Sequence, residues 1–493
     1  MKFLTFDEVG STSDIAKNLI KEGEVPPLTV LAKRQTSGRG RSGKTWLSPE
    51  GNIYLSIVLS KEHFKDNNPS ALPLAVGLSL CEYLERKFQL RLTLKWPNDI
   101  LFAGKKLVGI LLESSHTSDG WGNFIIGLGI NLKNPPLIPA VDTISLDELT
   151  GLSDNFDKEV FAKDLVSSLT SDLGKSWDLV SRYEKYGIEK GQPWIDPKKK
   201  LFLLDGISES GSMIVASHDR KIDLHTANHD LKWAYQKKGK DSYPILCADL
   251  GNTALKLAVY SPTGEKVFYK RYSYDQMDLI PFFQLRDKYK LPEKWPVHFI
   301  SVDPDKSALF SEKLNDYQYS AAELPKRSVA VDLNSYPIDQ LGIDRLCIIE
   351  AMKALYPAEN MVCVSLGTAM TIEVVFSDGK YQGGYIGAGP RMKLDVLHEK
   401  TGLLPKLDLR DLANINAINQ PFGMDTKSSM LKSVFFETVG IVESTIKKIE
   451  EITDQKHRLV FTGGDGELFA NYFKAEYFDG LVNDGIRVMI LGG

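Results

Sequence analysis

The sequence predicts a multidomain chain that combines α/β and α+β architecture, and three observations indicate this. At 493 residues the chain exceeds what one hydrophobic core usually holds, so several domains are expected. Residues 72–88 show apolar side chains at helical spacing, whereas residues 92–96 and 124–132 are typical of strands. In the second half, a strand, a glycine turn and a second strand occur twice, which indicates a duplicated fold.

A polar, charged stretch at 235–243 is the clearest boundary, because the apolar run 245–248 follows it directly. Before it, residues 193–233 contain short strand-like segments separated by Gly, Ser and Asp turns, which predict a small all-β domain. The predicted domains are a catalytic domain at 1–187, a small β domain at 188–235, a linker at 236–243 and a second catalytic domain at 244–493.

Composition narrows the functional classes. With 60 Lys plus Arg against 64 Asp plus Glu, the net charge is -4, which argues against a dedicated nucleic-acid binder. Four scattered cysteines in apolar runs are typical of buried thiols in a reducing compartment: Cys81, Cys247, Cys347 and Cys363. No stretch approaches the roughly 20 apolar residues that cross a bilayer. We therefore expect a cytoplasmic protein without a membrane segment.

The first group of chemically suggestive residues is a glycine and arginine loop. Residues 34–46, RQTSGRGRSGKTW, place Arg39, Arg41 and Lys44 among three glycines. Guanidinium groups bind phosphate or carboxylate oxygens in a bidentate manner, and glycines let a loop wrap closely around a ligand. Taken alone, the loop is equally compatible with a solvated basic surface or an RNA contact.

A lysine-bearing hairpin follows at 92–112. A strand runs into a Pro-Asn-Asp turn, and a second strand is expected to begin near Lys106, so that Lys95 and Lys106 lie near the hairpin ends. A desolvated lysine can neutralise a carboxylate and an α-phosphate while they react. A plain hairpin with surface lysines explains the turn but not its combination with the basic loop.

Together with GSTSDIAKNL at 10–19 and GLGINL at 127–132, these motifs resemble the biotin–protein ligase family over most of residues 1–235. The resemblance implies a biotin/lipoate ligase-like catalytic domain followed by a small β-barrel. It further implies that biotin and its adenylate contact Ser11, Thr12, Ser13, Gln35, Arg39, Gly40, Arg41 and Lys106, with Arg39, Arg41 and Lys106 catalytic. Ser13 stands where the family usually has Asn.

The reaction implied by this resemblance has two steps. The biotin carboxylate attacks the α-phosphate of ATP, assisted by Mg²⁺, and a lysine of a biotin carboxyl carrier protein then attacks the biotinyl-5'-AMP. Only ten residues precede Ser11, so we expect no helix-turn-helix domain and no transcriptional regulation by that route. A lipoate-type ligase is the alternative, although the Gly-Arg-Gly-Arg loop favours biotin.

The repeated hairpins of the second half carry the next group. Residues 245–260 and 362–376 align with Gly251 over Gly367, and a third glycine turn lies at 462–467. Asp249, at the end of an apolar strand beside glycine amides, can hold hydrated Mg²⁺ next to a triphosphate. The Asp-Leu-Gly-Asn turn alone is also typical of many hairpins.

A Gly-Ile-Asp-Arg sequence precedes a predicted helix within residues 335–357. Asp344 at the entrance to this helix is compatible with a simple N-cap. It is also compatible with a general base for a substrate hydroxyl, with Arg345 binding an anionic group.

Taken together, DLGNTALK, LGIDR, SLGTAMTIE, GGYIGAG and FTGGDGE resemble type III pantothenate kinases, members of the actin-like superfold that includes acetate and sugar kinases. The resemblance covers residues 244–493 and implies a homodimer. It implies ATP contacts from Asp249, Gly251, Asn252, Thr253, Lys256 and Thr368, with Asp249 holding Mg²⁺ through water. The implied pantothenate contacts are Tyr336, Gly342, Ile343, Asp344, Arg345 and Thr426, with Asp344 accepting the hydroxyl proton.

Three positions depart from the pattern of these kinases. Ser365 replaces an Asp that binds a monovalent cation, so dependence on K⁺ or NH₄⁺ is expected to be weak or absent. Ala388 replaces a proline, and Glu373 stands where Asp is common. The sequence predicts a bifunctional enzyme that biotinylates a carrier protein and makes 4'-phosphopantothenate in the first step of coenzyme A biosynthesis. The alternative is an active biotin ligase joined to a weakly catalytic, kinase-like binding or regulatory module.

Overall fold

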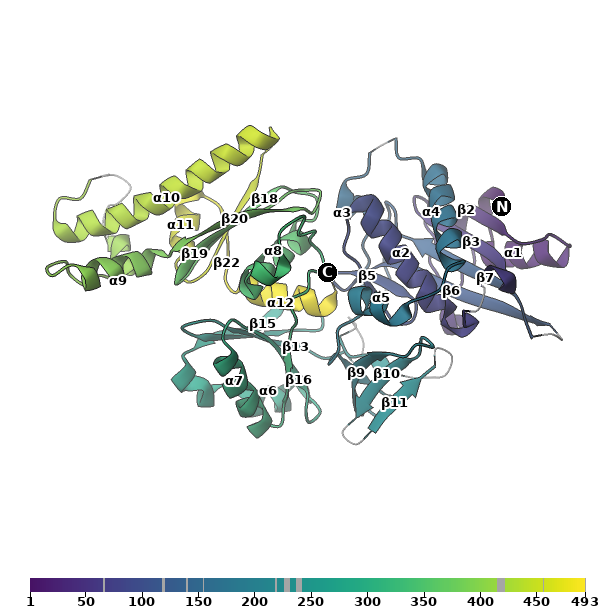
Figure 1. Cartoon of the computed structure of the whole chain (residues 1–493), viewed down its shortest axis with the longest axis horizontal. Helices are drawn as coiled ribbons and strands as arrows, with labels where there is room; N and C mark the ends of the chain where they lie inside the picture. Colours follow the sequence, from purple (N-terminus) through teal and green to yellow (C-terminus); the bar gives the residue numbers. More distant parts are fainter. Residues whose placement is uncertain are drawn as a thin grey trace.

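The computed structural model describes residues 1–64, 67–117, 120–138, 141–153, 155–217, 220–225, 231–235, 242–414, 422–454 and 456–492. Of the predicted linker at 236–243, only residues 242 and 243 are among them. The first half of the chain forms one side of the molecule, drawn from purple to teal, and the second half forms the other, drawn from green to yellow (Figure 1). The exact domain boundaries stay predictions.

A seven-stranded sheet organises the first half, in the order β1-β2-β3-β7-β6-β5-β4. Only β1 and β2 pair in parallel, and the other neighbours are antiparallel. The strands are β1 (Lys2–Val9), β2 (Leu28–Gln35), β3 (Ile53–Ser60), β4 (Thr93–Lys95), β5 (Asp99–Phe102), β6 (Lys105–Thr117) and β7 (Gly120–Ile130). The helices are α1 (Thr12–Lys21), α2 (Leu72–Phe88), α3 (Leu146–Thr150), α4 (Lys158–Leu173) and α5 (Leu179–Tyr186).

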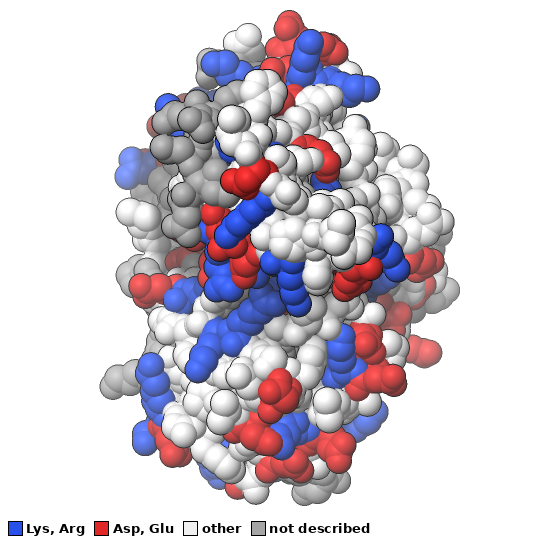
Figure 2. All heavy atoms as spheres, turned by 90° about the vertical axis from the view of Figure 1, so that its left-hand side faces the viewer, with Lys and Arg blue, Asp and Glu red and all other residues white. Residues whose placement is uncertain are grey.

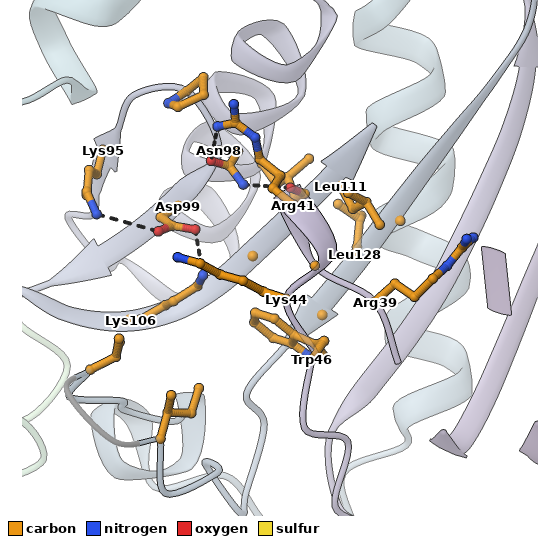
Figure 3. Close-up of a pocket in the computed structure, with 18 of the residues that line it drawn as sticks. Arg39, Arg41, Lys44, Trp46, Lys95, Asn98, Asp99, Lys106, Leu111 and Leu128 are labelled. Atoms are coloured by element: carbon orange, nitrogen blue, oxygen red, sulfur yellow. Dashed lines mark hydrogen bonds and ion pairs between the residues drawn. The ribbon is translucent and has the colours of Figure 1, made fainter. Parts of the chain in front are cut away.

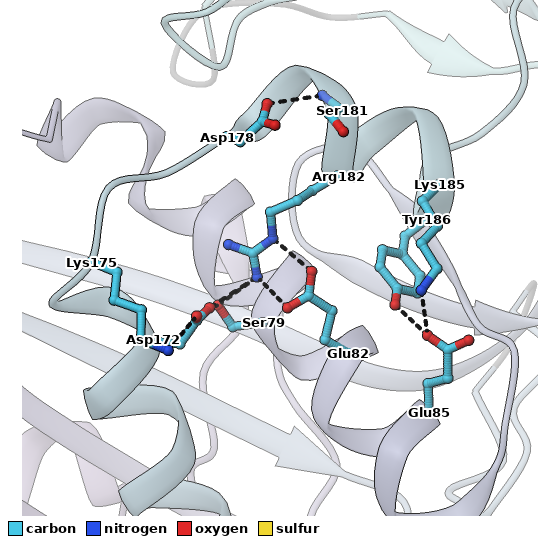
Figure 4. Close-up of polar contacts among 10 residues, drawn as sticks. All are labelled: Ser79, Glu82, Glu85, Asp172, Lys175, Asp178, Ser181, Arg182, Lys185 and Tyr186. Carbon is cyan, nitrogen blue, oxygen red and sulfur yellow. Dashed lines mark hydrogen bonds and ion pairs between the residues drawn. The ribbon is translucent and has the colours of Figure 1, made fainter.

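The predicted helix at 72–88 is confirmed with the same bounds as α2. Its apolar side chains are buried against the sheet, α4 and α5. A polar cluster fastens these helices together, as Figure 4 shows. Arg182 of α5 makes two hydrogen bonds to Glu82 of α2, at 2.8 and 3.0 Å, and one to Asp172 of α4, at 2.9 Å. Such a bidentate, partly buried pair fixes the angle between helices as well as their distance.

The lysine-bearing hairpin differs from its prediction. The second strand does not begin near Lys106, because β5 starts at Asp99 and Lys106 lies on a third strand, β6. The additional turn at Ala103 and Gly104 has φ values of 48° and 75°. Left-handed backbone at a residue other than glycine has no clear sequence signal, which explains the error. The additional strand brings Lys95 and Lys106 to the same side chain, Asp99.

The small all-β segment is confirmed as a five-stranded antiparallel sheet in the order β11-β10-β9-β8-β12. Its strands are β8 (Pro193–Ile195), β9 (Leu201–Ile207), β10 (Met213–Ser217), β11 (Arg220–Leu224) and β12 (Lys232–Trp233). Trp194 and Trp233 from its two neighbouring strands β8 and β12 are buried and border the larger sheet's cavity.

The second half contains two five-stranded sheets with the same arrangement, β15-β14-β13-β16-β17 and β20-β19-β18-β21-β22. In each, three antiparallel strands continue into two parallel ones. The first comprises β13 (Ile245–Leu250), β14 (Leu255–Tyr260), β15 (Lys266–Tyr272), β16 (Pro296–Ser301) and β17 (Ser320–Glu323). The second comprises β18 (Met361–Leu366), β19 (Ala369–Val375), β20 (Tyr381–Ala388), β21 (Arg458–Thr462) and β22 (Glu476–Phe478).

Two helices of this half, α8 and α12, pack on each other where the two sheets meet (Figure 1). The helices are α6 (Phe282–Tyr289), α7 (Pro304–Asp316), α8 (Ile343–Leu355), α9 (Pro390–Lys400), α10 (Thr426–Thr453), α11 (Gly466–Phe473) and α12 (Leu481–Leu491). Gly485 of α12 has no room for a side chain, because an added Cβ would lie 1.9 Å from the carbonyl oxygen of Cys347. The helix carrying Asp344 is therefore held tightly in place.

The two halves share a partly buried contact. Arg327 binds Glu189 at 2.9 Å and the backbone carbonyls of Glu184 and Gly187 at 2.7 and 2.9 Å. Gln192 donates to the carbonyl of Ile490 at 3.1 Å. At the end of α12, Leu491 packs against Gly104 in the turn that leads to Lys106. All four cysteines are buried with free thiols, as predicted. Within the described ranges, we find no helix with both the length and the apolar character needed to span a bilayer.

Candidate active sites

A cavity of about 380 Å³ lies against the seven-stranded sheet of the first half (Figure 3). Its walls come from the loop after β2, the start of α1, strands β4 to β7 and the small sheet. The structure brings all eight predicted biotin and adenylate residues to this one cavity: Ser11, Thr12, Ser13, Gln35, Arg39, Gly40, Arg41 and Lys106.

One end of the cavity is cationic and is organised by Asp99. The carboxylate of Asp99 lies 2.6 Å from Nζ of Lys106 and 3.7 Å from Nζ of Lys95. Burial alone would raise the pKa of Asp99, but the two lysines hold this pKa below its usual range. Burial, together with the neighbouring positive charges of Lys106 and Lys44, lowers the pKa of Lys95. Sequence reasoning missed Asp99, although a carboxylate between two lysines was a usable signal.

The basic loop contributes two arginines in different settings. Arg41 begins a short 3₁₀ turn, η1 (Arg41–Gly43), and its Nη1 donates to Oδ1 of Asn98 at 3.1 Å. Burial lowers the pKa of Arg41. Arg39 points away from this group (Figure 3), and its Nη2 lies 2.9 Å from Glu113 and 2.8 Å from Asp14. Arg41 is thus held beside Asn98 in the turn before Asp99, whereas Arg39 is bound to Glu113 and Asp14.

Apolar side chains, among them Trp46, also line the cavity. A Cβ added to Gly109 or Gly129 would lie 2.4 Å from the indole ring, so both positions require glycine. Nζ of Lys106 lies 4.9 Å from the ring centroid, a distance compatible with a cation–π contact. Trp46 was not singled out from the sequence. The cavity therefore suits a ligand with an apolar body and an anionic end.

In the second half, two equivalent glycine turns carry the predicted nucleotide residues. Gly251 donates its backbone N–H to the carbonyl of Ala254 at 3.1 Å, and Gly367 donates to Ala369 at 3.0 Å. Asp249 precedes the first turn and binds Nζ of Lys256 at 2.7 Å. The third turn joins the second, because Asp465 donates its N–H to the carbonyl of Leu366 at 3.1 Å.

Other predicted nucleotide residues lie in or next to these turns. Thr253 accepts a hydrogen bond from Nη2 of Arg271 at 3.2 Å, and the Asn252 carbonyl accepts one from Nζ of Lys306 at 2.7 Å. The carbonyl of Thr368 accepts from the N–H of Gly389 at 3.0 Å. Ser365 lies on β18, directly before this turn.

Asp344 occupies the first turn of α8, but Gly342 is the N-cap of this helix, so the simple N-cap interpretation of Asp344 is wrong. Burial raises the pKa of Asp344, and the negative charge of Asp249 raises it further, while the N–H of Arg345 acts in the opposite direction. The two carboxylates therefore act on each other across one shared region.

Arg345 is engaged inside the protein. Its Nε and Nη2 bind Glu373 at 2.6 and 2.9 Å, and Nη2 also donates to the hydroxyl of Tyr381 at 2.8 Å. Glu373 is completely buried. Tyr336 packs edge to face against Tyr381, with ring centroids 5.3 Å apart. Glu373 thus joins the predicted pantothenate residues as their internal support.

Thr426 is the predicted residue that stands apart. It is the first residue of α10, and the N-terminal end of α10 lies far from α8 in Figure 1. Its contact with pantothenate stays a prediction.

Comparisons with known proteins match the two halves of the chain to different families. Residues 6–131 match the Biotin/lipoate A/B protein ligase family, and residues 245–448 match Type III pantothenate kinase. The two halves of the chain are thus similar to two different enzyme families. Between these matched ranges lie the helices α3 to α5, the small sheet and the linker.

The first half is 33% identical over 173 residues to the Bifunctional ligase/repressor BirA of Bacillus spizizenii, which covers 35% of this chain and 47% of that relative. The chain thus spans about half the length of this relative. The second half is 28% identical over 242 residues to the Type III pantothenate kinase of Dehalococcoides mccartyi, covering 46% of this chain and 89% of the relative. A solved biotin protein ligase from Aquifex aeolicus in complex with biotin and ATP is 29% identical, covers 47% of this chain and 97% of its own, and gives a TM-score of 0.39.

Proposed function

We propose that this chain carries two activities. The first half joins biotin to a lysine of a biotin carboxyl carrier protein through biotinyl-5'-AMP. The second half phosphorylates pantothenate to 4'-phosphopantothenate, the first step of coenzyme A biosynthesis. The observation that carries this proposal is that each family match coincides with its own charged site, one built around Asp99 and one around Asp249 and Asp344.

In the ligase half, substrate charge would be met by fixed cations. Lys106, Lys95 and Arg41 gather at one end of the cavity, where the biotin carboxylate and the α-phosphate of ATP both carry negative charge. Preorganised cations in a partly buried site stabilise the charge that develops on the phosphoryl oxygens during attack. Trp46 and its glycine floor would shield the mixed anhydride from water. The proposed reaction requires no nucleophile from the enzyme itself.

In the kinase half, Asp344 would accept the proton of the pantothenate hydroxyl as its oxygen attacks the γ-phosphate. A carboxylate with a raised pKa is a better general base near neutral pH than an ordinary one. The amides of the glycine turns would hold the triphosphate oxygens. Asp249 offers the oxygen ligands that Mg²⁺ prefers and would hold it through water, and the ion would neutralise charge on the phosphates. Ser365 offers no charge to a monovalent cation, so K⁺ or NH₄⁺ would be dispensable.

The order of the strands supports a more specific fold assignment for each half of the chain. The two sheets with one strand order support an actin-like superfold for the second half, and the five antiparallel strands at 193–233 support a small barrel in the ligase half. Both assignments are part of the proposal. We place the protein in the cytoplasm, where carrier protein, ATP and pantothenate occur together.

We also propose a homodimer formed through the kinase half. Large exposed apolar side chains gather on β20, α9 and α10: Tyr385, Ile386, Met392, Val396 and Ile441. Figure 2 views this end of the molecule and shows a broad uncharged area beside a band of Lys and Arg side chains. Exposed apolar area of this kind is typical of a subunit contact. A partner copy would also explain why Thr426 lies away from Asp344.

The test is a two-substrate assay on the whole chain with Mg²⁺ and no added K⁺. We expect biotin-dependent labelling of a carrier protein and, separately, ADP release that depends on pantothenate. Carrier labelling without pantothenate-dependent ADP release would support the kinase-like binding or regulatory module instead. Transfer of lipoate in preference to biotin would support a lipoate-type ligase.

A further inference from the structure

Arg271 of β15 lies between two glycine turns of the kinase half. Its Nη2 donates to Oγ1 of Thr253 in the first turn at 3.2 Å. Its Nη1 lies 3.5 Å from the position that a Cβ would take at Gly464 in the third turn. The first turn follows β13 of one sheet, and the third follows β21 of the other. One guanidinium group thus reaches a turn of each sheet.

The register of the first sheet places Arg271 on the same face as Asp249, the residue proposed to hold Mg²⁺. Asp249 of β13 pairs directly with Lys256 of β14. Lys256 in turn pairs directly with Arg271 of β15. Directly paired residues project from the same face of a sheet. The three side chains therefore form one row that begins at the buried Asp249 and ends at the exposed Arg271.

The charge of Arg271 is not balanced by a carboxylate within the ranges that the structure describes. Neighbouring cations are balanced, because Nζ of Lys256 lies 2.7 Å from Asp249. Likewise, Nζ of Lys306 lies 3.3 Å from Asp303. Arg271 also stands directly opposite a second cation, Lys256, an arrangement that lowers the stability of a sheet. An anionic ligand beside Arg271 would offset this unfavourable arrangement.

The structural alternative is that Arg271 only fastens the first turn. Other donors already do so: the hydroxyl of Tyr274 donates to the carbonyl of Gly251 at 2.6 Å. Nζ of Lys306 contributes a further hydrogen bond to this turn, at 2.7 Å. The hydrogen bond from Arg271 to the Thr253 hydroxyl uses one of several guanidinium N–H groups, so others are available to a ligand.

We propose that Arg271 binds oxygens of the phosphate chain of ATP from its place between the two turns. This inference rests on the proposed kinase function. A guanidinium group suits the task, because its N–H groups form a planar fork that matches phosphate oxygens. With Mg²⁺ at Asp249, positive charge would lie at both ends of the row of side chains, and the phosphates would bind along it.

The experiment measures pantothenate-dependent ADP release by the full chain, without biotin, so that the ligase half consumes no ATP. Arg271→Ala should lower kcat/KM for ATP about 10- to 100-fold, because charge-assisted hydrogen bonds to phosphate are lost. Adenosine, a competitive inhibitor that lacks phosphates, should keep its inhibition constant. Arg271→Lys keeps the charge without the planar fork, so its kcat/KM should lie between the native and Arg271→Ala values.

Two further variants separate the phosphate contact from general effects. Lys270→Ala removes the same charge from the preceding residue of β15, whose side chain projects from the opposite face, and should leave kcat/KM unchanged. Tyr274→Phe removes a hydrogen bond to the first turn without removing charge. Its kcat/KM should fall less than that of Arg271→Ala.

An unchanged kcat/KM in Arg271→Ala would overturn the inference. So would an equal loss in Lys270→Ala or Tyr274→Phe, or a matching loss of inhibition by adenosine. Carrier biotinylation and the unfolding midpoint report whether each variant is folded, and if Arg271→Ala is not, Arg271→Lys is judged by the same comparisons. A native chain that releases no ADP in response to pantothenate would instead refute the proposed kinase function.

Discussion

The two candidate sites of this chain differ in the charge of the side chains that form them. The ligase cavity places several fixed cations around a single carboxylate, Asp99. The kinase site places two carboxylates, Asp249 and Asp344, within electrostatic reach of each other, and its arginine, Arg345, is bound to Glu373. The comparison teaches that cationic side chains predominate in one site, whereas paired carboxylates predominate in the other and would suit the proposed Mg²⁺.

The largest expected effect is the loss of kinase activity when one of the two paired carboxylates is removed. Asp344→Asn removes the proposed proton acceptor and should lower pantothenate-dependent ADP release by about 10²- to 10⁴-fold, while carrier biotinylation is retained. Asp339→Asn, an exposed carboxylate just before α8, is the control and should keep full activity. Because the pKa of Asp344 is raised, kinase kcat/KM should increase with pH through an acid limb that lies above the ordinary carboxyl value of 3.8. A normal limb near 3.8 would contradict the assignment.

The cationic site is tested by Lys106→Ala. Loss of this charge should lower labelled-biotin transfer about 10²- to 10³-fold, because the developing charge on the α-phosphate loses a preorganised partner. The control is Lys105→Ala, since Lys105 is the adjacent residue of β6 and points to the opposite face of the sheet. Equal loss in both variants would show that the strand, and not the charge, matters.

A third variant tests whether Arg345 stabilises the fold or binds the ligand. Glu373→Ala leaves a buried guanidinium without its anion and should lower the free energy of unfolding by about 3 kcal/mol or more. Glu359→Ala breaks an exposed pair with Arg458 and should cost below about 1 kcal/mol. Denaturant unfolding measures both, and similar small losses would mean that the buried pair is not structural.

The smallest expected effect concerns the contact between the two halves of the chain. Arg327→Ala removes one ion pair and two hydrogen bonds to the ligase half, and we expect a loss of about 1 to 2 kcal/mol in the free energy of unfolding. Arg410→Ala, whose ion pair with Asp408 is exposed, is the control. An unchanged midpoint in Arg327→Ala would show that the halves unfold independently of this contact.

The local sequence pattern was sufficient to predict much of the fold. Helix α2 was predicted to the residue, because its apolar side chains recur at helical spacing. The repeated hairpins around Gly251 and Gly367 also follow from sequence, since a glycine between two apolar strands marks a turn. The strand at Asp99 was missed because its turn depends on left-handed backbone at Ala103, which sequence does not announce.

The site residues could be predicted from the sequence only where they lie together in one continuous motif. The basic loop and the Lys106 hairpin could be joined by resemblance, and the structure brings them to one cavity. The pairing of Arg345 with Glu373 joins a helix, α8, to a strand, β19. Such contacts are set by tertiary packing, so no local pattern reveals them.

The packing of α12 against the ligase hairpin has a consequence for biosynthesis. The turn at Gly104 leaves the ribosome several hundred residues before Leu491, the side chain that covers it. At typical rates of about 5 to 20 residues per second, Leu491 is made roughly 20 to 80 seconds after Gly104. A growing chain therefore completes the ligase hairpin long before the side chain that packs against its turn exists.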